Sequence, residues 1–207
     1  MPNGRIILLN GTSSAGKTTL ARALQGLFDE PYLRAGVDHF VFMLPGRYLN
    51  QPHWNEVYRY TWSAGGSIAT IEPGPVGHRL MSAMHQTATA CARAGLNVIM
   101  DHVLLDRRWL QECVELWDGL AVLFVGVRCP LEVVEQRERD RKARTLGQAR
   151  AQWDQVHAHG VYDIQVDTSQ LDPDAAAQVI KRGLDDLPTP TAFERLRQRP
   201  HGNQRSK

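Results

Sequence analysis

One stretch near the start of the chain limits the fold more than any other. Residues 11–18, GTSSAGKT, match the pattern G-x-x-x-x-G-K-[ST] without a mismatch. A short apolar run at residues 6–9 precedes it and predicts a buried strand. Residues 19–28 follow it with apolar side chains on one helical face. Because strand, glycine loop and helix together are the context of a phosphate-binding loop, the sequence predicts an α/β protein of the P-loop NTPase class.

The chemistry of this loop comes from its backbone. Glycines allow successive N–H groups to turn inward around an anion, and the following helix adds its positive end. Lys17 is predicted to reach the outer phosphates of ATP, and the Thr18 hydroxyl to ligate Mg²⁺. The residues predicted to hold the nucleotide are Gly11, Thr12, Ser13, Ser14, Ala15, Gly16, Lys17, Thr18 and Thr19.

Size and charge exclude several classes of partner. A chain of 207 residues predicts one domain with a full core. A net charge of +2 gives no global field that favours nucleic acid or a membrane surface, and the apolar runs are too short to span a bilayer. The N-terminus leads directly into the first strand without a signal peptide, and the three cysteines form no C-x-x-C motif. We expect a cytoplasmic protein.

Strand and helix signals alternate along the chain, which predicts a parallel sheet flanked by helices. The strand signals lie at residues 6–9, 32–37, 97–100, 120–127 and 164–167, and the helix signals at 19–28, 78–94, 107–117, 130–144, 146–157 and 173–187. These signals define one domain at residues 1–187 around the phosphate-binding loop. The basic segment 188–207 is predicted to be a solvated extension.

Residues 46–77 form an irregular insertion rich in proline, glycine and aromatic side chains. Long irregular segments within a compact domain are usually functional. The aromatic residues between positions 48 and 62 fit the wall of an acceptor pocket, and equally a piece of core beneath a long loop.

Two aspartates follow predicted strands. In doubly wound sheets, ligands bind beyond the carboxyl ends of the strands, where Asp38 and Asp101 are expected. Asp101 is predicted to hold the metal together with Thr18, and Asp38 to orient the acceptor hydroxyl and accept its proton. The alternative for each is a helix cap or a turn former.

An arginine run occupies the segment 137–150, which we predict to be a lid. Arg137, Arg141 and Arg144 share one helical face at i, i+4 and i+7. Guanidinium groups suit the charge of a phosphoryl group in transfer, and a closed lid excludes water. Arg137 is predicted to bind the nucleotide and assist catalysis, and Arg141 to bind the nucleotide. The alternative is a solvated helix with acidic surface partners.

Several pieces, taken in order, resemble the chloramphenicol phosphotransferase-like family over the chain up to about residue 187. They are the loop at 11–17, Ala35-Gly36-Val37-Asp38, Ala94-Gly95 leading to Ile99-Met100-Asp101, Val125-Gly126-Val127-Arg128-Cys129, Arg137, Val156-His157, Tyr162-Asp163 and Val166-Asp167-Thr168. The resemblance implies a P-loop kinase of the nucleoside-monophosphate-kinase type, with five parallel strands. It implies ATP-dependent phosphorylation of a hydroxyl, as in the member that acts on chloramphenicol. It also implies a catalytic role for Asp38, ATP and Mg²⁺ contacts for Lys17 and Thr18, and a lid role for Arg137.

The resemblance has two gaps. Residues 46–70 do not follow the family pattern, and His102 stands where a second acid is expected after Asp101. The leading hypothesis is therefore an ATP-dependent kinase of a small-molecule hydroxyl, either an antibiotic or a metabolite. The alternatives are a zeta-toxin-like kinase of nucleotide sugars, and an ATP-binding regulator without an acceptor, which would lack a pocket beside Asp38.

Overall fold

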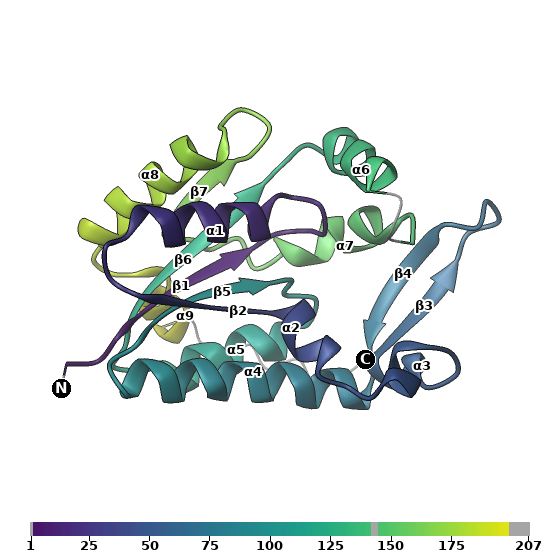
Figure 1. Cartoon of the computed structure of the whole chain (residues 1–207), viewed down its shortest axis with the longest axis horizontal. Helices are drawn as coiled ribbons and strands as arrows, with labels where there is room; N and C mark the ends of the chain where they lie inside the picture. The colour runs from purple at the N-terminus through teal and green to yellow at the C-terminus, as the bar shows by residue number, and fades with distance from the viewer. Residues whose placement is uncertain (1, 142–144, 199–207) are drawn as a thin grey trace.

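A five-stranded parallel sheet forms the centre of the molecule (Figure 1). The computed structural model describes residues 2–141 and 145–198. The strand order is β2-β5-β1-β6-β7. The strands are β1 Arg5–Asn10, β2 Tyr32–Gly36, β5 Asn97–His102, β6 Ala121–Arg128 and β7 Ile164–Asp167. The prediction of five parallel strands with helices on both faces is confirmed.

The apolar run of β1 explains why this strand lies in the middle of the sheet. Ile6, Ile7, Leu8 and Leu9 are all 0% exposed. Ile6 and Leu8 belong to the core cluster on one face, and Ile7 and Leu9 to the cluster on the other. A strand that is covered on both faces needs such a continuous apolar run.

Helices cover the two faces of the sheet. α1 Lys17–Leu27 and α8 Pro173–Asp185 lie on one face, and α4 Pro75–Arg93 and α5 Arg107–Leu116 on the other (Figure 1). The short helix α2 Val37–Phe42 follows β2 directly, and α6 Leu131–Asp140 and α7 Gln148–Val156 connect β6 to β7. No helix within the described ranges is long and apolar enough to cross a membrane.

The insertion 46–77 is more regular than the sequence predicts. It contains a 3₁₀ turn at Gly46–Leu49, the helix α3 Trp54–Val57 and an antiparallel hairpin. The hairpin strands are β3 Tyr58–Trp62 and β4 Ile68–Pro73, and α4 already begins at Pro75 instead of residue 78. Ile68 and Ile71 anchor β4 in the core cluster under α4. Beyond this anchor the hairpin extends away from the five-stranded sheet (Figure 1).

The tail prediction is wrong for the helix α9 Ala192–Gln198. Phe193 is 1% exposed and stacks on Trp117 of the α4–α5 face, with ring centroids 5.6 Å apart. Ala192, Phe193 and Leu196 give this helix an apolar side that covers the core, whereas Glu194 is exposed. Both arginines of the helix are half-buried and donate hydrogen bonds to backbone carbonyls of the segments beneath it. Residues 199–207 of the predicted tail lie outside the described residues.

The predicted lid consists of the end of α6, the start of α7 and a short connection. Arg144 lies in the range 142–144, outside the described residues. Glu138, only 2% exposed, accepts hydrogen bonds from the backbone N–H groups of Gly147 and Ala149, at 2.7 and 3.1 Å. The N–H of Ile68 on the hairpin donates to the carbonyl of Leu146 at 2.8 Å. The segment after the arginine run is thus bonded both to α6 and to the hairpin.

Candidate active site

The phosphate-binding loop has the curled backbone that its sequence predicts. It leaves β1 after Asn10 and enters α1 at Lys17. Ser14 and Gly16 both adopt the left-handed region, with φ of 61° and 86°. A side chain at Gly11 would lie 2.5 Å from the carbonyl oxygen of Val127, so only glycine fits there. This conformation turns backbone N–H groups toward an anion.

One buried polar atom of the loop also points to an anionic ligand. Within the part of the chain that the structure describes, the Ser14 hydroxyl is buried without a hydrogen-bond partner. Buried polar groups normally have partners, and exceptions often mark a ligand site. Ser14 lines both of the cavities described below, so a phosphate oxygen could supply the missing partner.

Lys17, Thr18 and Asp101 meet at the carboxyl end of the sheet, as predicted. The Lys17 Nζ donates to the carbonyl of Thr12 at 2.8 Å and lies 3.6 Å from Asp101 Oδ1. The Thr18 hydroxyl donates to Asp101 Oδ2 at 2.7 Å. Gly36 permits this arrangement, because a Cβ there would lie 3.2 Å from the Cβ of Asp101.

The oxygen atoms of Thr18 and Asp101 fit a magnesium ion. Mg²⁺ binds through one or two carboxylates, with phosphate oxygens and water as the remaining ligands. Among residues 2–141 and 145–198, no three histidine, cysteine or acidic side chains gather around one point. A metal at this position would therefore share its coordination between the protein and the nucleotide.

His102 takes no part in this cluster. Its side chain is 0% exposed, and its Nε2 lies 2.8 Å from Nε2 of His85. Burial, followed by the neighbouring His85, lowers the pKa of His102 well below its usual value, so the ring is neutral. His102 belongs to the core on the α4 side and does not replace a second acid.

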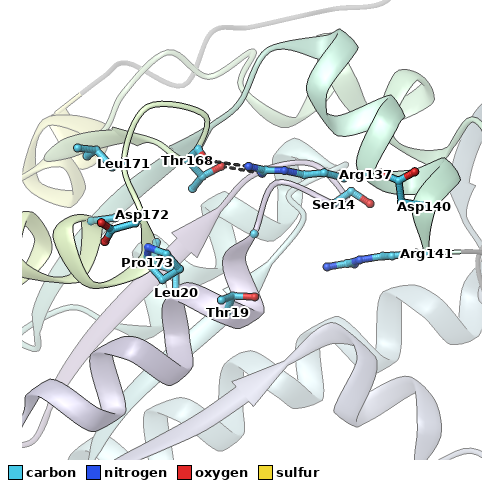
Figure 2. Close-up of a pocket in the computed structure, with 12 residues that line it drawn as sticks. Ser14, Thr19, Leu20, Arg137, Asp140, Arg141, Thr168, Leu171, Asp172 and Pro173 are labelled. Atoms are coloured by element: carbon cyan, nitrogen blue, oxygen red, sulfur yellow. Dashed lines mark hydrogen bonds between the residues drawn. The ribbon is translucent and has the colours of Figure 1, made fainter.

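A cavity of about 440 Å³ lies on the α1–α8 side of the phosphate loop (Figure 2). We call it the donor cavity. Its walls include Thr19 of α1, Pro173 of α8, and both Arg137 and Arg141. Arg137 donates to the Thr168 hydroxyl at 3.1 Å and to its carbonyl at 2.8 Å (Figure 2). The Thr168 hydroxyl in turn donates to the Ala15 carbonyl at 2.8 Å. Arg137 is thus connected to the phosphate loop through one residue. Its role in catalysis stays a prediction.

A larger cavity of about 810 Å³ lies on the other side of the loop. We call it the acceptor cavity. Lys17, Thr18 and Asp101 line it, and so does the exposed Asp38 in the first turn of α2. Ser14, Gly16 and Arg141 line both cavities. The two cavities therefore meet at the phosphate loop, and Asp38 lies in the larger one.

Aromatic side chains of the insertion form one wall of the acceptor cavity. They are Trp54, Tyr58, Tyr60 and Trp62. Trp54 contacts Tyr58 and Tyr60 with ring centroids 5.6 and 6.0 Å apart, and Tyr60 contacts Trp62 at 6.1 Å. Burial is the main cause that raises the pKa of Tyr58, with Tyr60 and Asp38 adding to it, so its hydroxyl keeps its proton. Tyr58 belongs to the core and also lines the cavity, and the role of these residues toward an acceptor stays a prediction.

Gln152 is a site residue that the sequence did not reveal. It lies on α7 and is 7% exposed, and its Oε1 accepts a hydrogen bond from the Ser13 N–H at 2.6 Å. This amide belongs to the loop that is expected to cradle phosphate. A glutamine in an amphipathic helix gives no sequence signal for such a contact, because the contact depends on how α7 packs.

Comparison with known proteins identifies the family. The model of the family described as "Chloramphenicol phosphotransferase-like protein" matches residues 4–185. A Mycobacterium tuberculosis protein named "Putative O-phosphotransferase Rv2636" is 36% identical over 204 residues, which cover 96% of this chain and 90% of that protein. The chain belongs to the chloramphenicol phosphotransferase-like family.

Solved structures share the fold at low sequence identity. The APS kinase CysC of Mycobacterium tuberculosis, in complex with AMPPNP and APS, has a TM-score of 0.62 and 14% identity, covering 89% of this chain and 99% of that chain. A sugar kinase from Janibacter sp. has a TM-score of 0.63 and 18% identity, covering 91% of this chain and 98% of that chain. These similarities establish the P-loop kinase fold.

Proposed function

We propose that this chloramphenicol phosphotransferase-like protein transfers the γ-phosphate of ATP to a hydroxyl group of a small molecule. The observation that carries the proposal is the meeting of two cavities at one phosphate-binding loop, with Asp38 exposed in the larger of them. A donor in one cavity and an acceptor in the other would bring their reacting ends to the same point. A cytoplasmic location, where ATP is available, belongs to the proposal.

The donor side would bind the nucleotide. The backbone amides of the loop and the Ser14 hydroxyl would hold phosphate oxygens. Lys17 would contact the outer phosphates, and Arg137 and Arg141 would bind the nucleotide from the donor-cavity wall. The bound AMPPNP named in the APS kinase structure agrees with an adenine nucleotide as the donor. Thr18 and Asp101 would hold Mg²⁺, which neutralises charge on the phosphates when bound.

The acceptor side would orient the hydroxyl. Asp38 would accept a hydrogen bond from this hydroxyl and then its proton as the oxygen attacks phosphorus and the bond to ADP breaks. Because phosphoryl transfer is largely dissociative, positioning counts for more than early removal of the proton. The aromatic wall and the lid segment would exclude water, which competes with the acceptor for the phosphoryl group.

The acceptor cavity favours this function over a regulator that only binds or hydrolyses ATP. Such a regulator needs no space beside Asp38, whereas the cavity there has a volume of about 810 Å³. Pockets for small molecules lie in this size range and are lined mainly by apolar and aromatic side chains.

The test is a transfer assay with purified protein, Mg-ATP and a panel of hydroxyl compounds. The family name makes chloramphenicol the first acceptor, and simple alcohols, sugar alcohols and hydroxy acids complete the panel. We expect acceptor-dependent ADP release and a product heavier by one phosphoryl group. The Lys17→Ala protein, prepared in parallel, controls for contaminating kinases. ADP release that no acceptor stimulates, without a phosphorylated product, would contradict the proposal.

A further inference from the structure

Two arginines of the acceptor cavity have no role in the chemistry described so far. Arg22 on α1 and Arg34 on β2 both line this cavity, and neither lines the donor cavity. Within residues 2–141 and 145–198, no protein hydrogen bond or ion pair involves either guanidinium group. On the donor side, by contrast, Thr168 binds the guanidinium of Arg137. Arg34 is half-buried, so a missing partner matters more there than on the open surface.

The fold brings the two arginines to the same side of the acceptor cavity. Arg34 pairs in the sheet with Ile99, whose side chain belongs to the core cluster on the α1 face. Arg22 follows Thr18 by four residues on α1, so these two side chains share one helical face. Both guanidinium groups therefore lie on the α1 side, near the end of the cavity where Thr18 and Asp101 meet.

The opposite wall is apolar. Tyr58 and Ile71 line the same cavity but belong to the core cluster under α4. Asp38 lies in the first turn of α2, which follows β2, and lines the same cavity. The cavity thus has a cationic side, an aromatic side and the proposed base.

The charges around the cavity are not balanced. Its charged lining consists of Lys17, Arg22, Arg34 and Arg141 against Asp38 and Asp101. Lys17 lies 3.6 Å from Asp101, and Arg141 also lines the donor cavity. Arg22 and Arg34 are the two cations left for the acceptor. Guanidinium groups bind carboxylate and phosphate oxygens in pairs of parallel hydrogen bonds.

We propose that the acceptor is an anion: a hydroxyl compound with a ring-containing apolar body and a carboxylate or phosphate group that Arg22 and Arg34 bind. The proposal rests on the proposed function, because it names the substrate class of the same site. It also separates this chain from an enzyme built for a neutral acceptor such as chloramphenicol. The two arginines would attract acids to the cavity and would hold them with the ring against the aromatic wall.

The experiment compares acids with their uncharged amides. Benzoate, phenylacetate and 4-phenylbutyrate are titrated into the protein by calorimetry, each beside its amide. Saturating Mg-ADP is present throughout, so that the phosphate loop is filled and cannot bind the carboxylates. The three chain lengths cover different spans between the aromatic wall and the arginines. The variants are Arg22→Gln and Arg34→Gln, with Arg107→Gln as the control, since Arg107 is exposed and lines neither cavity.

We expect at least one acid to bind about tenfold more tightly than its amide, as one charge-assisted contact provides. Arg34→Gln should remove most of this preference, Arg22→Gln part of it, and Arg107→Gln none. Equal binding of every acid and its amide would overturn the proposal, and so would an acid preference that survives both cavity variants.

A transfer assay with 4-(hydroxymethyl)benzoate and benzyl alcohol separates this proposal from the proposed function. Phosphorylation of both compounds with equal efficiency would contradict the proposal of an anionic acceptor and would support the proposed kinase activity. An acid preference in binding, combined with no transfer to any hydroxyl compound, would support the anion site and contradict the kinase.

Discussion

The donor side and the acceptor side of this molecule are built in different ways. One continuous stretch, the loop between β1 and α1, lies at the centre of the donor side, and residues of α6 and of the start of α8 complete its cavity. The acceptor side combines the end of β2, the hairpin β3–β4 and the start of α7, segments that are distant in the sequence. The phosphate-binding loop is therefore encoded locally, whereas the shape of the acceptor cavity depends on tertiary packing.

Removing the loop lysine tests the donor side with the largest expected effect. Lys17→Ala takes away the charge nearest the outer phosphates, and we expect kcat to fall by about a thousandfold, as for other lost transition-state donors. The loss should be the same for every acceptor, because Lys17 acts on the shared phosphoryl group. Rapid-mix product analysis measures kcat, and circular dichroism checks the fold. A fall in kcat that differs strongly between acceptors would mean that Lys17 also acts on the acceptor, and would contradict the separation of the two sides.

The junction between the hairpin and α7 gives the next largest effect. Gly147 has a φ of 94°, and a Cβ there would lie 2.5 Å from the carbonyl oxygen of Ile68. Gly147→Ala should lower the free energy of unfolding by about 2–3 kcal/mol, from backbone strain plus displacement of the hairpin. Gly119→Ala is the matched control, because Gly119 has a φ of 73° and nothing within 4 Å of its Cβ position.

Urea denaturation of both glycine variants measures this difference. Gly119→Ala should cost only the backbone strain, about 1 kcal/mol. Gly147→Ala should also raise the KM for the acceptor and leave the KM for ATP unchanged. Equal destabilisation by the two substitutions would mean that the contact between Gly147 and Ile68 contributes nothing.

A crossed pair of variants sharpens the comparison further. Arg137→Ala removes a guanidinium from the donor cavity, and Trp54→Ala removes a ring from the aromatic wall. We expect each to raise the KM of its own substrate about tenfold, which corresponds to about 1.4 kcal/mol, and to leave the other KM unchanged. Steady-state kinetics with both substrates varied gives the four constants. If Arg137→Ala changed the acceptor KM as strongly as that of ATP, the two cavities would not be separate sites.

Acid sensitivity concerns the fold that both sides share, because His85, His102 and His157 line neither cavity. Burial, followed by the charge of Arg128, lowers the pKa of His157 to about 3, and burial also lowers the pKa of His85 and of His102. Between the folded pKa and the unfolded value of 6.5, the unfolded chain binds more protons, so stability falls as the pH decreases. We expect a loss of up to about 1.4 kcal/mol per pH unit for each histidine below pH 6.5.

Urea titrations between pH 7.5 and 5 measure this slope. His157→Gln should reduce it, because the side chain no longer takes up a proton on unfolding. A slope that His157→Gln leaves unchanged would show that this ring titrates alike in the folded and unfolded chain.

The sequence predicted the conformation of the phosphate loop and the sheet around it for a physical reason. The phosphate loop requires its glycines and Lys17 at a fixed spacing, which the sequence shows directly. The continuous apolar runs near it indicate strands of a parallel sheet that is buried on both faces. The acceptor side gave weaker signals. The aromatic and β-branched residues of 58–62 and 68–73, separated by Gly65-Gly66, are typical of a hairpin, and proline and glycine nearby obscured them.

Two further features depend on packing in different ways. The contact between Gln152 and the Ser13 N–H depends on where α7 lies, which no local pattern specifies. The spacing of Ala192, Phe193 and Leu196 is that of an amphipathic helix, but the prediction rested on the basic residues around them and missed it. Tertiary burial of Phe193 against Trp117 outweighed that charge.

The central claim is that Asp38 orients an acceptor hydroxyl toward a phosphoryl group held on the loop. Asp38→Asn tests it most directly, since the amide keeps the size of the side chain but cannot accept the proton. The measurement is single-turnover transfer to the best acceptor, with nucleotide affinity determined on the same protein. The account predicts that transfer slows by a hundredfold or more, at about the scale of general-base catalysis, while the Kd for Mg-ATP stays within about twofold. Transfer at the wild-type rate would contradict the role of Asp38.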